Sequence, residues 1–295
     1  MADFDDIVNA VKAKECILFL GAGVHNPPKD TDPIYGGCYP EADRPPVGAD
    51  LATILADASG LNSDVDYSKE AKLAIAGDLK RVSLYYEITK SRTDLVNKVR
   101  DVVSDNKQPS RALRALAALD FPIICTTNYD KLFERALILE GKDPIVSAYS
   151  NDRFAITKDY TGPKLNPRKP FLFKIHGDID DPTDSIVITD EDYIEFILRI
   201  IWGIGQFDPI PSIFTFHLRF WPVLFVGFSL MDYNLRLVFK IMGWEIPKPK
   251  QSYSIGPYPD GLIRKKYDPP VKFVVQDVWS FVPDLYEAVT GNPMP

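Results

Sequence analysis

The chain has 295 residues, 45% of them hydrophobic and 25% charged, which is enough to bury the core of one large α/β domain or two small ones. Its net charge is −7 and its Lys and Arg residues form no block, so a protein that binds the nucleic-acid backbone directly is disfavoured. The three cysteines, Cys16, Cys38 and Cys125, are widely spaced, which excludes a zinc ion held by four thiolates of this chain and indicates a reducing compartment.

The N-terminal stretch is acidic and amphipathic, unlike a signal peptide, and predicts a helix over Asp6–Lys14. No apolar run approaches the ~18 residues of a membrane span, so we expect a cytoplasmic protein. The run Cys16–Leu20 then predicts a buried strand that ends in a GAG turn at residues 21–23. This turn begins a dinucleotide-binding fingerprint, but Asn26 occupies the place of its third glycine.

A long loop rich in Pro, Gly and Asp follows from Val24 to Val47. A loop of this length in a compact domain is usually a lid, a binding loop or a flexible segment. A dehydrogenase would instead continue with a helix and a second strand that ends in an acidic residue. The sequence therefore disfavours hydride transfer. His25 borders the GAG turn, where it either contacts a substrate or shapes the loop.

The remaining elements alternate between helices and strands. Helical runs at Ala49–Ala58, Glu70–Ile75, Lys80–Ile88 and Asp94–Val103 predict a helical insertion over about residues 48–110. Ser110 is expected to cap the helix RALRALAAL, which leads into a strand at Pro122–Thr126. Further strands are expected at Phe171–Ile175, Ile186–Thr189, Val223–Val226, Tyr253–Ile255 and Val271–Val275, with helices such as Asp190–Ile201 and Asn234–Met242 between them.

This alternation predicts an α/β fold of the Rossmann-like type, with a mostly parallel sheet, helices on both faces and no zinc module. We expect a single domain over residues 1–290, with residues 291–295 as a frayed tail. The apolar segment Phe196–Trp221 is either a core helix or an interface, and its His217 belongs to one of these rather than to a catalytic site.

Glycine and polar residues follow four of the expected strands, where open parallel sheets bind their ligands. These positions are Gly21, Ala22 and Gly23; Thr127, Asn128 and Asp130; His176; and Gly227 and Ser229 with Asp232. Taken singly, each has a structural alternative, because a glycine turn needs no ligand and Asn, Asp and Ser often cap helices. Their shared position and order make the set a candidate site.

The motifs GAG, TTNYD, KIHGD and VGFS, in this order, resemble the sirtuin (silent information regulator) family over most of the chain. The longer stretches FPIICTTNYDKLFERAL, KIHGDIDDPTDSIVITDEDYIEF and LFVGFSLMDYNLRLV are similar to the sirtuin-like NAD-consuming domains of bacterial anti-phage systems. Sirtuin-type deacylases usually carry a four-cysteine zinc module, which the cysteines of this chain cannot form. The family also commonly has Ser where His25 stands.

The resemblance implies that NAD binds across the sheet as a substrate, with no metal, and that Asn128 and His176 are the catalytic pair. It places Ala22 and Gly23 at the pyrophosphate, Gly227 and Ser229 near a ribose or phosphate, and Asp130 near the nicotinamide. The expected NAD-binding residues are Gly21, Ala22, Gly23, Val24, Thr127, Asp130, Gly227, Ser229 and Asp232.

The chemistry of NAD cleavage suits these side chains. Nicotinamide leaves from a cationic state, so no general acid is needed, unlike in an ordinary glycosidase. Asn128 is a neutral polar group that can position the ribose and a water molecule, and His176 can accept the proton of that water. Asp130 would stabilise positive charge or hold the nicotinamide amide.

The leading hypothesis is an NAD hydrolase that depletes NAD in anti-phage defence, silent until a regulator acts. Because the sirtuin-like domain fills nearly the whole chain, we expect a homo-oligomer and a separate partner, a HerA-type ATPase first and a short Argonaute second. The alternatives are an NAD-dependent deacylase or ADP-ribosyl transferase, and a module that senses NAD or ADP-ribose without turnover.

Overall fold

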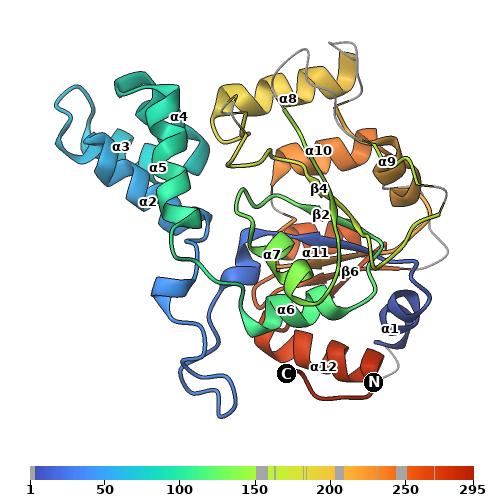
Figure 1. Ribbon diagram of the computed structural model, residues 1–295. Helices are drawn as coiled ribbons and strands as arrows, with labels where there is room; N and C mark the ends of the chain where they lie inside the picture. The colour runs from blue at the N-terminus through green and yellow to red at the C-terminus, as the bar shows by residue number, and fades with distance from the viewer. Residues whose placement is uncertain are drawn as a thin grey trace.

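A parallel seven-stranded sheet forms the centre of the computed structural model, which describes residues 4–150, 159–162, 164–181, 183, 185–202, 209–230, 232–243, 251–268 and 270–295 (Figure 1). Its strands are β1 (Ile17–Leu20), β2 (Ile123–Thr126), β3 (Ile145–Ala148), β4 (Phe171–Lys174), β5 (Val223–Val226), β6 (Ser252–Ile255) and β7 (Val271–Val274). They lie in the order β3-β4-β2-β1-β5-β6-β7, and every neighbouring pair is parallel. The strand order therefore reverses direction at β1, which lies between β2 and β5.

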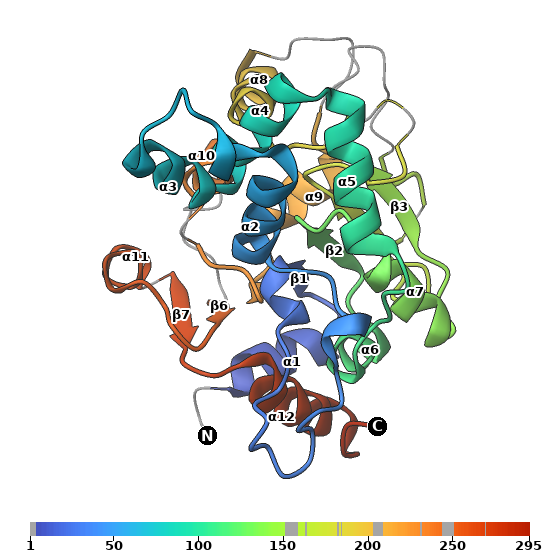
Figure 2. The same cartoon turned by 90° about the vertical axis from the view of Figure 1, so that its left-hand side faces the viewer.

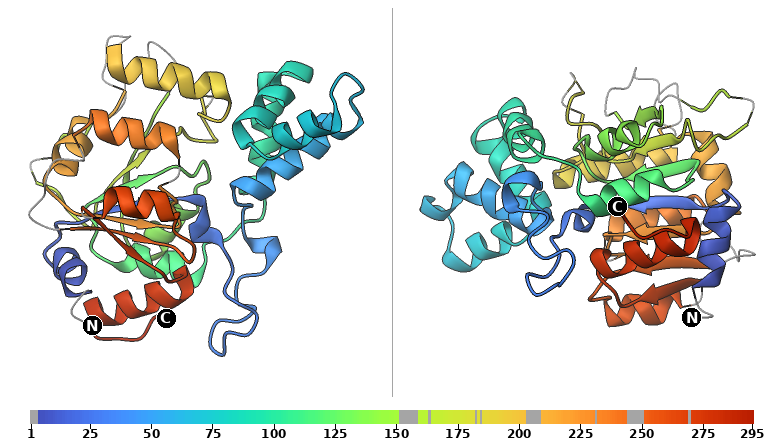
Figure 3. Two further views of the ribbon diagram at one scale, coloured as in Figure 1. Left: turned by 180° about the vertical axis from the view of Figure 1, so that it is seen from behind. Right: turned by 60° about the horizontal axis from the view of Figure 1, so that its bottom comes forward.

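Helices cover both faces of the sheet, as the sequence predicted (Figure 3). One face packs against α1 (Asp5–Lys12), α6 (Arg111–Ala118), α7 (Leu132–Leu139) and α12 (Val278–Thr290). The other packs against α8 (Asp190–Trp202), α9 (Ser212–Leu218), α10 (Tyr233–Ile241) and α11 (Gly261–Tyr267). Alternate residues of β1 separate accordingly, since Leu18 joins the first core and Phe19 the second. The Rossmann-like α/β fold is thereby confirmed.

A helical lobe stands beside the sheet and is built from α2 (Gly48–Ser59), α3 (Lys69–Ala76), α4 (Leu79–Thr89) and α5 (Arg92–Ser104) (Figures 1 and 2). It has a hydrophobic core of its own, to which Ile186 and Ile188 from the β4–α8 connection contribute. Arg92 of α5 also forms an ion pair of 2.9 Å with Asp192 of α8. The lobe is therefore held against the carboxyl-terminal side of β4.

Some expected elements are corrected by the structure. Ile186–Thr189 is buried but is not a strand, because its apolar side chains fill the junction between the lobe and the sheet. Its Val187 N–H donates to the carbonyl of His176 instead of to a neighbouring strand. Strand β3 and helices α11 and α12 were not expected. Strand β3 lies at the sheet edge and most of it is half-buried, so its sequence IVSA carries a weak strand pattern.

Most of the Pro-rich segment is a loop, with short 3₁₀ turns at Ala22–His25 and Glu41–Asp43. Two of its tyrosines, Tyr35 and Tyr39, are buried against Trp279 of α12. The C-terminus does not fray as expected. Met294 is 6% exposed, and the Pro295 carbonyl accepts a hydrogen bond of 2.8 Å from Arg111.

The apolar segment Phe196–Trp221 divides between α8 and α9, with residues 203–208 outside the described part of the chain. Phe196 and Phe214 are fully buried in the core. Phe216 and Phe220 of the same segment are 59% and 53% exposed. The segment thus supplies core side chains and also an exposed apolar surface. Within the described residues, no helix combines the length and the apolar character that a membrane crossing requires.

Candidate functional site

The carboxyl ends of β4, β2, β1 and β5 meet at one edge of the sheet, because these strands are consecutive neighbours. The connections that follow them begin at Ile175, Thr127, Gly21 and Gly227. A crevice at the point where strand order reverses is where open α/β sheets bind ligands. The four predicted motifs therefore come together in space, although they span more than 200 residues of sequence.

The two glycine turns pack directly against each other. The Gly23 N–H donates to the Gly227 carbonyl over 2.8 Å. A Cβ atom added to Gly21 would lie 2.5 Å from the same carbonyl oxygen, and one added to Gly227 would lie 2.0 Å from the Val24 nitrogen. Gly227 also has a φ of +65°, which other residues rarely adopt. These glycines are therefore required for the two turns to approach, whether or not a ligand is bound.

Two adjoining cavities open at this edge of the sheet. The smaller, of about 160 Å³, is lined by Asn128, Asp130 and His176, and the start of α2 in the helical lobe covers it. The larger, of about 550 Å³, extends from Gly23 and Gly227 towards Tyr258 and Trp279. The residues common to both linings are Ala22, Gly48, Thr127, Phe228 and Asp232. The cavities therefore form one elongated groove across the switch point.

The predicted site residues differ in how they meet this groove. Ser229 is exposed in the larger cavity. Asp232 lines both cavities and also caps α10, because its Oδ1 accepts from the Leu235 N–H at 3.3 Å. Gly21 and Val24 line neither cavity, and Val24 is fully buried beneath the turn. Their contribution is to the shape of the turn.

Asn128 presents an unpaired acceptor. Its backbone N–H donates to Thr126 Oγ1 at 3.0 Å, which fixes the start of the loop. Its side-chain Nδ2 lies 3.5 Å from the Gly21 carbonyl oxygen and 3.2 Å from His25 Nε2. Its Oδ1 is buried and has no hydrogen-bond partner among the described residues. A buried polar atom without a partner is costly, so this oxygen is a candidate contact for a ligand.

His176 stands two residues after the end of β4 and is 4% exposed. The rings of Tyr193 and Phe196 meet it at near-perpendicular angles, with centroids at 5.2 and 6.2 Å. Burial lowers the pKa of His176 to about 4, although the Asp232 carboxylate opposes that shift. Its Nε2 is buried without a hydrogen-bond partner in the described part of the chain. The ring is therefore neutral near pH 7.

Asp130 brings a negative charge to the smaller cavity. Its Oδ1 accepts from the Leu132 N–H at 2.8 Å, so it also caps the start of α7. Its Oδ2 lies 3.3 Å from His25 Nε2, and both side chains are almost fully buried. Burial raises the pKa of Asp130, but His25 and then Lys174 outweigh that effect, so the net pKa is below its ordinary value.

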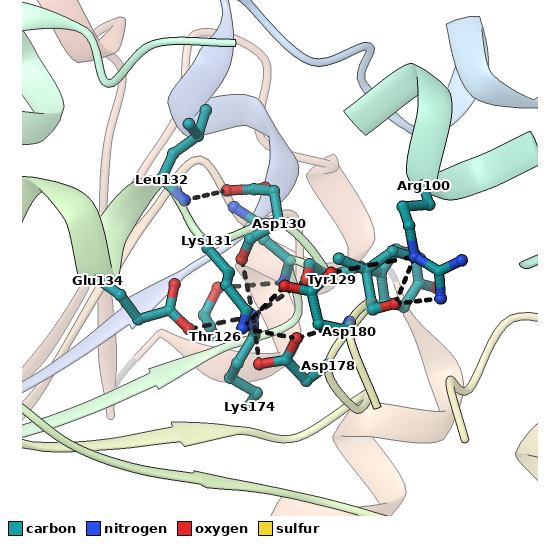
Figure 4. A network of polar contacts seen from close by, with 12 residues as sticks. Arg100, Thr126, Tyr129, Asp130, Lys131, Leu132, Glu134, Lys174, Asp178 and Asp180 are labelled. Carbon is teal, nitrogen blue, oxygen red and sulfur yellow. Dashed lines mark hydrogen bonds and ion pairs between the residues drawn. The ribbon is translucent and has the colours of Figure 1, made fainter. Parts of the chain in front are cut away.

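A buried lysine joins the two loops that carry Asn128 and His176 (Figure 4). The Lys174 Nζ donates to the carbonyls of Tyr129 and Asp130 at 3.0 and 2.7 Å. It also lies 3.2 Å from carboxylate oxygens of both Glu134 and Asp178. Our sequence interpretation missed this group. The one available signal was a lysine inside the apolar strand FLFKI, where an ionisable side chain must find partners.

The groove is acidic and contains no basic side chain of the Lys or Arg type among the described residues that line it. Asp130, Asp232, Asp260 and Asp277 contribute carboxylates. Within the same described residues, no group of three or more His, Cys, Asp or Glu side chains is arranged to hold a metal ion. An anionic ligand would therefore depend on backbone and hydroxyl donors.

Comparisons with known proteins point to one family. Residues 122–271 match the family model described as a SIR2-like domain. Curated relatives named NAD(+) hydrolase ThsA are similar to the chain, one from Cytobacillus dafuensis at 29% identity over 192 residues, covering 65% of this chain and 35% of the relative. Another, from Bacillus cereus, is 31% identical over 198 residues, covering 62% and 38%.

The chain spans about a third of the length of these curated relatives. Among solved structures, one titled as a complex of a Sir2 homolog with NAD aligns over 97% of this chain and 94% of its own. Its sequence identity is 14% and its TM-score 0.36.

Proposed function

We propose an activity for this chain from the premise that it belongs to the SIR2-like domain family, whose model matches residues 122–271. The proposed activity is NAD hydrolysis, in which water cleaves the bond between nicotinamide and ribose and releases nicotinamide and ADP-ribose. One observation carries the proposal. Asn128 Oδ1 and His176 Nε2 belong to two side chains that line the same small cavity, and each atom is buried without a partner among the described residues. The names of the curated relatives support the same activity.

The dimensions and chemistry of the groove support a position for NAD. The nicotinamide and its ribose are assigned to the smaller cavity, beside Asn128, Asp130 and His176. The pyrophosphate is assigned to the shared region at Ala22 and Thr127, next to Gly23, Gly227 and Ser229. The adenosine is assigned to the larger cavity. We treat residues 1–290 as the catalytic domain that holds this groove.

The reaction needs few groups from the protein. The C1′–N1 bond breaks as both of its electrons move to the pyridinium nitrogen, and neutral nicotinamide leaves. The ribose then carries oxocarbenium character, and a water oxygen bonds to C1′. Asn128 Oδ1 accepts a hydrogen bond from this water or from a ribose hydroxyl. His176 Nε2 accepts the proton that the water loses, and a weak base suffices because the ribose is already cationic.

Asp130 supports the developing positive charge. Its carboxylate lines the same cavity and has a lowered pKa, so it is ionised when the ribose becomes cationic. A fixed charge in a site that excludes water stabilises a transition state without having to reorganise. We therefore assign an electrostatic role to Asp130 and a proton-transfer role to His176.

In a cell, the proposed hydrolase would deplete NAD during anti-phage defence and would be inactive until it is triggered. We propose that it acts as a homo-oligomer with a separate regulatory partner, for which a HerA-type ATPase is the first candidate and a short Argonaute the second. The exposed phenylalanines Phe216 and Phe220 support α9 as part of a contact surface.

Incubation of the purified chain with NAD tests the activity directly. We expect free nicotinamide and ADP-ribose without any acceptor, and we expect Asn128→Ala and His176→Ala to abolish them while the variants keep the wild-type circular dichroism. Release that requires an acyl-lysine peptide would indicate a deacylase instead. If NAD stays intact in every condition, including in the presence of the regulatory partner, the result would favour a module that senses NAD or ADP-ribose without turnover. Wild-type turnover by both variants would refute the site assignment.

A further inference from the structure

His25 is a buried side chain at the candidate site to which the proposed reaction assigns no role. It is 2% exposed. Its Nδ1 lies 3.4 Å from the hydroxyl of Tyr39 in the Pro-rich loop. Its Nε2 lies 3.2 Å from Asn128 Nδ2 and 3.3 Å from Asp130 Oδ2. The ring therefore connects the Pro-rich loop to Asn128 and Asp130 of the β2–α7 loop.

The partners of Tyr39 determine where the His25 ring carries its proton. The Tyr39 hydroxyl lies 3.1 Å from the Gln108 carbonyl oxygen, which can only accept a hydrogen bond. Burial raises the pKa of Tyr39, so the hydroxyl keeps its single hydrogen and donates it to Gln108. The Tyr39 oxygen then meets His25 Nδ1 as an acceptor. His25 Nδ1 must therefore carry a hydrogen.

With Nδ1 protonated, His25 Nε2 can satisfy only one of its two neighbours. In the neutral ring, Nε2 has a lone pair and accepts from Asn128 Nδ2, which leaves Asn128 Oδ1 directed away from it. In the imidazolium, Nε2 donates to the Asp130 carboxylate. The N–H at Nε2 then lies against the NH₂ group of Asn128, and two donors cannot form a hydrogen bond. Rotation of the Asn128 amide removes this repulsion.

We propose that His25 is a positioning residue whose ring sets the orientation of the Asn128 amide. The neutral ring holds Oδ1 towards the ribose and water, and the protonated ring pairs with Asp130 and releases the amide to turn its NH₂ group to the cavity. This role rests on the proposed hydrolase activity, since it assigns the productive orientation to Oδ1.

Several titratable and charged groups surround the His25 ring. Tyr39 faces the ring from the Pro-rich loop, Asp130 from the β2–α7 loop, and His176 lines the same cavity from the β4–α8 connection. Lys174 lies behind Asp130, on its backbone carbonyl. Burial lowers the pKa of His176 to about 4, so the His176 ring stays neutral when the pH falls from 8 to 5.5.

Two substitutions separate orientation from simple packing. His25→Gln retains an amide oxygen that accepts from Asn128 but does not titrate, and His25→Phe retains the ring shape without an acceptor. At pH 8, we expect kcat of His25→Gln to lie within about fivefold of the wild type and that of His25→Phe to fall by at least about 50-fold, with KM for NAD changed less than about threefold. Acidification that protonates the His25 ring should lower wild-type kcat, whereas the same change of pH should leave kcat of His25→Gln level. His217→Gln, in α9, is the matched control and should keep the wild-type profile.

The proposal is overturned if kcat of His25→Gln falls on acidification as much as that of the wild type. It is also overturned if His25→Phe keeps the wild-type kcat. A second measurement does not depend on turnover. In the NAD-free protein at pH 8, side-chain ¹⁵N spectra should show His25 with Nδ1 protonated and Nε2 unprotonated, assigned by the signal that His25→Gln removes. The opposite tautomer overturns the role of His25. A wild-type chain that never cleaves NAD overturns the hydrolase proposal, and the ¹⁵N spectrum then still decides the His25 tautomer.

Discussion

Replacing Lys174 with Met tests how strongly the buried lysine holds the two loops of the site together. The Lys174 side chain is fully buried, and its ammonium has four oxygen partners at 2.7 to 3.2 Å. Methionine has a similar length and fills the space, so the change removes charge and hydrogen bonds with little loss of packing. Glu134 and Asp178 would then lose their buried cation, and the partly exposed Lys131, 3.9 Å from Asp178, would remain as the neighbouring positive charge.

Removing one partner from a buried ion pair costs about 3–5 kcal/mol, because the remaining charge has neither water nor a counter-charge. For a chain of this size, such a loss lowers Tm by about 5–8 °C. Lys131→Met is the matched control, since its ammonium pairs with Asp180 at 2.8 Å but its side chain is 43% exposed. An exposed ion pair of this kind contributes about 0–1 kcal/mol.

Urea denaturation of both variants at pH 7 measures the two free energies of unfolding. The double variant Lys174→Met/Glu134→Gln should recover part of the loss, because it also removes one of the unpaired carboxylates. A Lys174→Met deficit no larger than that of Lys131→Met would refute the reasoning, since the ammonium would then contribute no more than a surface charge.

The pH dependence of this deficit has a definite sign. Burial raises the pKa of Glu134, and Lys174 holds that increase in check. Without Lys174 the folded-state pKa rises further above its unfolded value, so the folded variant binds a proton that the unfolded chain does not. Stability is then gained as pH falls towards the unfolded pKa and lost as pH rises through the folded pKa. The Lys174→Met deficit should therefore be smaller at pH 5 than at pH 7.

Three further predictions concern the glycine turns, the proposed catalytic histidine His176 and the choice of nucleotide. Gly227→Ala should cost more than about 3 kcal/mol and abolish NAD binding, because its Cβ would lie 2.0 Å from the Val24 nitrogen. Gly291→Ala, also at positive φ but in open space, should cost only about 1–2 kcal/mol when urea denaturation compares the two variants. Because burial lowers the pKa of His176 to about 4, the folded chain binds fewer protons than the unfolded chain as pH falls from 6.5. His176→Gln should therefore lose up to about 3 kcal/mol less stability than the wild type between pH 7 and 4, and equal losses would contradict the buried neutral ring. NADP should be cleaved at least about tenfold less efficiently than NAD, because carboxylates and no Lys or Arg of the described residues line the larger cavity. Asp260→Asn keeps a good helix cap and should raise the ratio of NADP to NAD cleavage, which kcat/KM for each nucleotide will show.

The sequence predicted the sheet well because its strands are apolar runs flanked by glycine or polar turns. Six of the expected strands match observed ones to within about one residue at each end, and Ser110 caps α6 as expected. Ile186–Thr189 has the same apolar pattern but does not form a strand. Its side chains Ile186 and Ile188 are buried against the helical lobe instead of within the sheet. Hydrophobicity alone reports burial, and only the tertiary structure shows which element provides it.

The polar network was harder to predict because its members act through long-range contacts. Lys174 and Glu134 are separated by 40 residues, and His25 and Asn128 by 103. No local pattern pairs such residues, whereas the strand-end rule needs only the position of each motif relative to its own strand. The rule therefore predicted that Asn128 and His176 lie at one edge of the sheet, where both line the smaller cavity, but it could not show that His25 lies against Asn128.

The missing third glycine of the fingerprint has a structural explanation in the turn itself. Instead of an α-helix, residues Ala22–His25 form a 3₁₀ turn, in which the Val24 N–H donates to the Gly21 carbonyl. The Gly23 N–H is already used by Gly227. In a dinucleotide-binding helix, these donors and the helix N-terminus would hold the pyrophosphate. Here they close the turn, which places His25 beside Asn128, so the sequence after GAG favours the proposed cleavage site over a binding site for an intact cofactor.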